Sequence, residues 1–165
     1  MPKFVRLSAF AALLSATVAT SAFADDVAKW AREANDRAEI QALMSRYERA
    51  LDTLNVDAYV AVFTEDAVFG TAKGREGIRE LIAGIKAGRE KNAEPGKPPV
   101  PTYQSIQNMT IEFTSKTTAT IDGYYMALLG AQDGKPARVA TVGHEVDEVV
   151  KQNGKWLISK RTVSP

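Results

Sequence analysis

Cysteine is absent from this chain of 165 residues, and histidine occurs only once, as His144. Without cysteine there is no disulfide, no thiol nucleophile, no thiolate metal ligand and no lipid-modified N-terminal cysteine. One histidine does not make a zinc or iron site, because such a site needs several converging ligands. We therefore expect neither a metal nor another cofactor.

The chain also lacks a large excess of either positive or negative charge, since it contains 21 Lys and Arg residues and 20 Asp and Glu residues. There is no basic block of the kind that attracts nucleic acid, so we expect no nucleic-acid partner. The hydrophobic fraction of 45% and the charged fraction of 25% are those of a soluble globular chain, and the length fits one domain.

Long apolar runs are absent except near the N-terminus, where Lys3 and Arg6 precede an apolar run from Leu7 to Val18. The run is short for a membrane span, and a small-x-small pattern ends at Ala24. This layout predicts a secretory signal peptide over residues 1–24, with an uncleaved anchor as the alternative. Cleavage would leave 21 − 2 = 19 basic against 20 acidic residues. We expect a periplasmic or secreted mature chain without membrane attachment.

The next residues have helical patterns. Residues 25–35 form a predicted helical lead-in, and Asp36 with Glu39 is typical of a capping box that starts a new helix. Glu48 falls on the expected outer face of that helix, and Asn55 is expected to end it and cap the next one. The expected buried stripe has helical spacing and consists of Ile40, Leu43, Met44, Tyr47, Leu51 and Leu54.

The second half of the chain has the pattern of strands. A third helix is predicted from Gly74 to about Lys91, and the proline-rich residues 92–101 exclude helix and central strand. We interpret these residues as an ordered loop or the edge of a lid. A short strand is predicted at residues 67–69, and a four-stranded antiparallel meander at residues 103–114, 118–129, 137–151 and 156–163, with Asp-Gly and Asn-Gly turns. Helices followed by strands indicate an α+β fold.

Five stretches in this order resemble the SnoaL-like family of the nuclear-transport-factor-2-like superfamily. They are DRAEIQALMSRYERALD, VDAYVAVFTEDAVF, GREGIRELI, QNMTIEF and VGHEVDEVVKQNGKWLISKR. The resemblance implies one domain over residues 36–163, with a cone-shaped, curved and mostly antiparallel mixed sheet around three N-terminal helices. It also implies a pocket for a small, largely apolar ligand and allows a homodimer through the sheet face. Family members include dehydratases, isomerases and non-catalytic binders.

The dehydratase-like members use a Tyr, an Asp and a His in their pocket. Tyr47 and Asp52 match the Tyr and the Asp, whereas Gln104 stands at the position of the His. Glutamine does not titrate, so it can hold a carbonyl or hydroxyl group but cannot act as a base. By the same resemblance, Asn108 falls on a pocket strand.

The remaining candidates lie on the predicted strands. The apolar neighbours Val142 and Val146 suggest that His144 faces inward, either as a substitute base or as an ordinary imidazole. Glu145 and Asp147 lie on the other face and are solvated if that face is outward, or a second acid pair in the pocket if it is inward.

Two further residues complete the candidates. Tyr124 and Tyr125 fall on opposite faces of their strand, so one of them, assigned here as Tyr125, can line the pocket. Arg161 could hold an anionic ligand or form a structural ion pair. We expect a binding protein of altered or lost dehydratase activity; the alternative is a cofactor-independent lyase or isomerase that uses Asp52, Tyr47 and His144.

Overall fold

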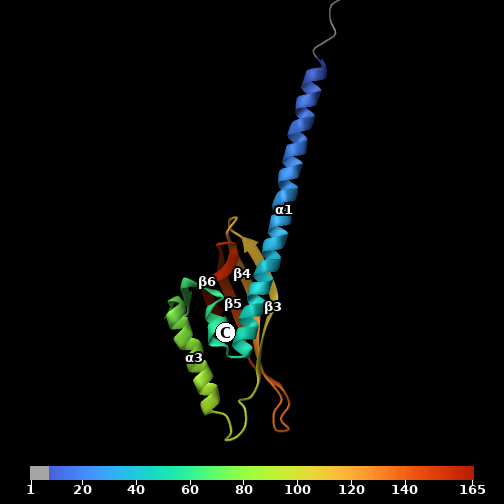
Figure 1. Cartoon of the computed structure of the whole chain (residues 1–165). Coiled ribbons are helices and arrows are strands. Elements are labelled where there is room, and N and C mark those ends of the chain that lie inside the picture. The colour runs from blue at the N-terminus through green and yellow to red at the C-terminus, as the bar shows by residue number, and fades with distance from the viewer. Residues whose placement is uncertain (1–7) are drawn as a thin grey trace, which may run out of the picture. The chain divides into compact units, whose positions relative to one another are not determined.

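The computed structural model describes the backbone of residues 8–165 and the side chains of residues 23–165 (Figure 1). The chain forms two compact units, residues 1–38 and 39–165. The described part of the first unit is helical, and it contains an i, i+4 ion pair between Lys29 and Glu33 at 3.9 Å. Among the described residues, no helix is long and apolar enough to cross a membrane. Residues 1–7 of the predicted signal peptide lie outside the described residues, and its cleavage stays a prediction.

The helix α1 is continuous from Ser8 to Asp52. The predicted helix start at Asp36 is therefore wrong. The reason is that this span contains no Gly or Pro to interrupt the helix, so a capping pattern in its middle is not used. The prediction for Asn55 is confirmed, because its side chain accepts a hydrogen bond of 3.0 Å from the Ala58 N–H at the start of α2 (Val56–Val60).

The second unit contains one curved, unclosed sheet of six strands. The strands are β1 (Phe63–Phe69), β2 (Ala72–Lys73), β3 (Thr102–Phe113), β4 (Thr118–Leu129), β5 (Arg138–Gln152) and β6 (Lys155–Ser164), and the helix α3 (Gly74–Lys91) follows β2. The order in the sheet is β2-β1-β6-β5-β4-β3, and only β1 and β6 are parallel. This confirms the predicted α+β class with a mostly antiparallel mixed sheet.

Two details differ from the prediction at the start of the sheet. Strand β1 begins at Phe63 instead of residue 67, and the two-residue strand β2 was not expected. Phe63 is fully buried and lies opposite Ile158 of β6, so pairing with the last strand extends β1 backwards. Such a long-range pairing leaves no local pattern in the sequence.

The two predicted hairpin turns are confirmed. Asp133 and Gly134 have φ angles of 52° and 75°, and Asn153 and Gly154 have φ angles of 50° and 77°. Left-handed conformations at both central residues are those of the type I′ turn, which suits the twist of the flanking strands. These turns fix how β5 pairs with β4 and β6, and so which side chains share a face.

The core of the second unit is mainly aliphatic and aromatic. It includes Trp156, which is 2% exposed. Other large buried residues come from α1, α2, α3 and the sheet: Ile40, Leu43, Tyr47, Tyr59, Phe63, Ile78, Ile82, Ile121 and Ile158. Three charged side chains are buried in the same unit, and they form the centre of the candidate site.

Candidate functional site

The alternation of side chains along β5 decides which of the candidates face the interior. Glu145 and Asp147 are completely buried, whereas the side chain of His144 is 37% exposed. The expectation that His144 faces inward is therefore wrong. Its neighbour Val142 is 57% exposed, so the apolar residues beside His144 belong to the outer face. Of the two alternatives for Glu145 and Asp147, the inward acid pair is the one the structure has.

Arg161 joins these two carboxylates. It lies opposite Asp147 in the register of β5 and β6 and is 3% exposed. Its Nη1 donates to Asp147 Oδ2 at 2.5 Å, and its Nη2 donates to Glu145 Oε2. The guanidinium carbon lies 4.3 Å from the centre of the Tyr47 ring, and the Tyr59 hydroxyl donates to the Tyr47 hydroxyl at 3.2 Å. We call these five residues the inner cluster.

One cation shared by two buried carboxylates leaves the inner cluster short of positive charge. Burial raises the pKa of Asp147 to about 7; Arg161 opposes this shift and the charge of Glu145 adds to it. Burial also raises the pKa of Tyr47 above its usual value, so its phenol stays protonated and can donate. Asp147 is thus placed to exchange a proton near neutral pH.

The inner cluster has hydrogen-bonding capacity that the described residues do not fill. Glu145 Oε1, Asp147 Oδ1 and Arg161 Nε are buried and have no hydrogen-bond partner among them. Buried polar atoms are nearly always satisfied, so atoms of this kind mark a place for a water molecule or a ligand group. Donors and acceptors together suit a hydroxyl or carbonyl group.

A second pair of acids lies at the end of α1. The Gln104 N–H donates to Asp52 Oδ1 at 2.6 Å, and the Ile106 N–H donates to Glu48 Oε1 at 2.7 Å. Glu48 and Asp52 are four residues apart on a helix, which corresponds to a rise of about 6 Å. Gln104 and Ile106 are two residues apart on a strand, which corresponds to about 6.8 Å. The spacing of the two carboxylates therefore matches the spacing of the two N–H groups. Because β3 is an edge strand, these groups would otherwise lack partners.

These carboxylates line a cavity of about 490 Å³, which we call the α1-end cavity. Its lining brings together Asp52 and Gln104, as the resemblance implied, although the main chain of Gln104 and not its side chain binds the carboxylate. Burial raises the pKa of Glu48 and of Asp52, and their backbone hydrogen bonds oppose the shift. Glu48 was expected on the outer face of the helix and was not predicted as a site residue. Its spacing of four residues from Asp52 is the sequence feature that could have indicated that the two carboxylates act as a pair.

A third place holds the other candidates. Asn108, Tyr125 and His144 line a cavity of about 400 Å³, to which β3, β4, β5 and Pro165 contribute. The His144 Nε2 lies 3.0 Å from Asp122 Oδ1. The Tyr125 ring lies across Gly143, where a Cβ atom would come within 2.5 Å of it, so glycine is required there.

The predicted site residues thus fall into three groups. Tyr47 and Arg161 belong to the inner cluster, Asp52 and Gln104 to the α1-end cavity, and Asn108, Tyr125 and His144 to the third cavity. The α1-end cavity and the inner cluster are neighbours, since the charges of Glu145 and Arg161 act on the pKa of Glu48. Tyr59 is not among the predicted site residues, and nothing local in the sequence points to its contact with Tyr47.

The family model of the SnoaL-like domain matches residues 32–162. The chain belongs to the SnoaL-like family. No curated protein matches it.

Several solved structures share the fold. A nuclear-transport-factor-2-like protein with a cystatin-like fold from Novosphingobium aromaticivorans has a TM-score of 0.69 at 21% identity, covering 84% of this chain and 87% of that one. A protein of the same species whose proposed activity is aromatic ring hydroxylation has a TM-score of 0.62 at 28% identity, covering 79% and 88%. A Catenulispora acidiphila protein in complex with S-DNPA has a TM-score of 0.64 at 25% identity, covering 79% and 92%.

Proposed function

We propose that this SnoaL-like protein binds a small, largely apolar molecule and holds one hydroxyl or carbonyl group of it at the inner cluster. The observation that carries the proposal is the set of buried polar atoms without partners on Glu145, Asp147 and Arg161. A ligand hydroxyl there would accept a hydrogen bond from the Arg161 Nε–H and donate one to a carboxylate, whereas a ligand carbonyl would only accept. The complex of the Catenulispora acidiphila protein with S-DNPA supports ligand binding by this fold.

The ligand would reach the inner cluster through the α1-end cavity. That cavity of about 490 Å³ has the size of a small-molecule site, and the charges of Glu145 and Arg161 act on Glu48 in its lining. The dehydratase mechanism of the resemblance is not favoured. Gln104 cannot act as a base, and His144 lies on the opposite face of β5, away from Glu145 and Asp147. We therefore propose that dehydratase activity is altered or lost.

Binding can be tested with three probes of similar size: 2-naphthol, 1-tetralone and naphthalene. We expect wild type to bind at least one of the first two about tenfold more tightly than naphthalene, measured by calorimetry. Tyr47→Phe, which removes only the hydroxyl, should reduce this preference several-fold because the inner cluster loses a donor. His144→Gln is the control and should bind as wild type does. Equal affinity for all three probes, or an unchanged preference in Tyr47→Phe, would contradict the proposal.

The pKa of Asp147 favours a second candidate, a cofactor-independent isomerase or lyase step. A carboxylate with a pKa of about 7 can remove a proton next to a carbonyl group, and Tyr47 and Arg161 can stabilise the negative oxygen. In D₂O, Asp147 would take a proton from C2 of 1-tetralone and return a deuteron. We expect deuterium incorporation, followed by NMR, to rise through pH 7 in wild type and to be absent in Asp147→Asn. Binding of 1-tetralone without incorporation would leave the binding function and exclude the catalytic one.

Export and self-association complete the proposal. N-terminal sequencing of the protein from a periplasmic fraction should show Asp25 as the first residue; an intact N-terminus would contradict cleavage after Ala24. The outer sheet face presents exposed apolar side chains, among them Tyr124 and Val142, which support a homodimer through that face. Val142→Lys should then shift a dimer to monomer in analytical ultracentrifugation.

A further inference from the structure

A separate cavity of about 420 Å³ lies between the proline-rich loop and the turn that joins β4 to β5. None of its lining residues lines the α1-end cavity or belongs to the inner cluster. Its volume lies within the range of small-molecule sites. It is therefore a candidate binding site for a second molecule, separate from the ligand proposed above.

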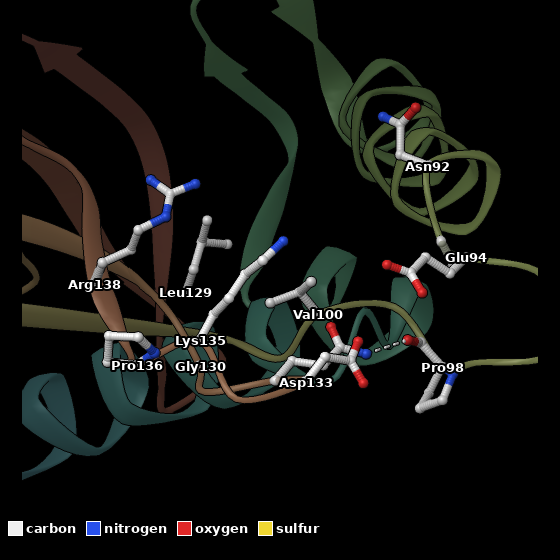
Figure 2. A pocket seen from close by; sticks show the side chains of 12 residues that line it. Asn92, Glu94, Pro98, Val100, Leu129, Gly130, Asp133, Lys135, Pro136 and Arg138 are labelled. Atoms are coloured by element: carbon white, nitrogen blue, oxygen red, sulfur yellow. Dashed lines mark hydrogen bonds between the residues drawn. The ribbon is translucent and has the colours of Figure 1, made fainter.

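Hydrogen bonds between the loop and the turn hold the walls of this cavity in place. The Gly130 N–H donates to the Pro101 carbonyl at 2.7 Å, and the Gln132 amide donates to the Pro98 carbonyl at 3.1 Å, the dashed line in Figure 2. A Cβ atom on Gly130 would come within 3.1 Å of the Pro101 side chain, so glycine permits this close approach. The cavity is thus formed before a ligand arrives, which reduces the entropy cost of binding.

The charges around the cavity are unequally paired. Lys97 binds both acids of the rim, Glu94 at 2.8 Å and Asp133 at 2.9 Å. By contrast, Lys135 and Arg138 form no ion pair with any side chain of residues 23–165. The lining itself contains two cations and two acids; with Lys97, which pairs with both acids from outside the lining, the local formal charge is 3 − 2 = +1.

The unpaired cations and the apolar lining lie next to one another. Figure 2 shows Lys135 and Arg138 extending from one side of the cavity, with Leu129 between them. Val100 also lines the cavity and is 41% exposed, which is unusual for valine. We infer that this cavity binds a small organic anion, whose apolar body covers Leu129 and Val100 and whose carboxylate or sulfonate lies between Lys135 and Arg138.

The inference can be tested with two fluorescent probes that differ only in one sulfonate group. They are 8-anilinonaphthalene-1-sulfonate and the neutral N-phenyl-1-naphthylamine. The test variant is Lys135→Gln/Arg138→Gln, which changes two exposed residues and is expected to fold normally. The matched control, Lys116→Gln/Lys155→Gln, removes the same charge from the turn that follows β3 and from the first residue of β6.

We expect the affinity for the sulfonate to fall about three- to tenfold in the test variant and to stay within about twofold in the control, because each exposed ionic contact is weak. The neutral probe should bind all three proteins equally. In NMR spectra, the sulfonate should shift the amide signals of Val100, Leu129 and Gly130. The inference is overturned if wild type does not bind the sulfonate, if both variants lose affinity equally, or if the shifts lie only on the outer sheet face. These readouts are independent of the Tyr47 test, so the two proposals can fail separately.

Discussion

The second unit contains two pairs of carboxylates that have different partners. The strand pair is Glu145 and Asp147 on β5, and the helix pair is Glu48 and Asp52 on α1. The strand pair is completely buried and shares the single guanidinium of Arg161. In the helix pair, each carboxylate has a backbone N–H group of β3 to itself. The pKa values of Asp147, Glu48 and Asp52 are all raised by burial, and that of Asp147 is raised to about 7.

This difference separates a pair with unpartnered polar atoms from a pair whose members each accept a backbone hydrogen bond. Two acids that compete for one cation leave buried charge and buried oxygens without partners, which are the conditions for ligand binding or proton transfer. Two acids that each accept a backbone hydrogen bond complete the edge of a sheet. The family resemblance directs attention to Asp52, whereas the geometry favours Asp147.

The largest effect should come from removing the shared cation. Arg161→Met would leave two buried carboxylates without a counter-charge, and we expect the free energy of unfolding to fall by about 3–5 kcal/mol in urea titrations. The triple variant Glu145→Gln/Asp147→Asn/Arg161→Met carries no charge at these positions and should recover most of that loss. A loss below about 1 kcal/mol in Arg161→Met would show that the inner cluster is not held by its ion pairs.

The pH dependence of stability should identify the proton on Asp147. Its pKa is raised from 3.8 to about 7 in the folded protein, so between these values the folded state binds more protons than the unfolded state. The stability of wild type relative to Asp147→Asn should therefore decrease as the pH rises from 5 to 7, by up to about 1.4 kcal/mol per pH unit. Urea unfolding at pH 5, 6, 7 and 8 measures the difference. A constant difference would mean that the carboxylate ionises normally.

The sequence predicted what depends on local pattern. The Asp-Gly and Asn-Gly turns and the cap at Asn55 follow from short-range chemistry, and they agree with the structure. The α+β order of elements was predicted for the same reason. The additional strand β2 and the early start of β1 depend on partners far away in the chain, which no local pattern records.

The candidate site was predictable only in part. Period-2 alternation separates His144 from Glu145 and Asp147, but it does not say which face is inward. Arg161, which is buried on the neighbouring strand, accounts for the inward orientation of Glu145 and Asp147. Its positive charge compensates two carboxylates that would otherwise be excluded from the interior. The role of the helix pair could not be predicted for a similar reason, because the N–H groups that bind these carboxylates are more than fifty residues away in the sequence.

The smallest effect should come from the helix pair. Asp52→Ala removes the acceptor for the Gln104 N–H, and Glu48→Ala removes the one for Ile106. Because both carboxylates are partly exposed, we expect losses of only about 0.5–1 kcal/mol in urea titrations. Asp52→Asn keeps an acceptor and should lose less.

Hydrogen exchange gives the sharper test, since each variant serves as the control for the other. The amide of Gln104 should exchange faster in Asp52→Ala and that of Ile106 faster in Glu48→Ala, while the other amide stays protected. Equal exchange of the Gln104 amide in wild type and Asp52→Ala would mean that the carboxylate does not protect the edge strand. In that case the structural explanation for Asp52 fails, and Asp52 becomes a candidate for chemistry again, beside Asp147.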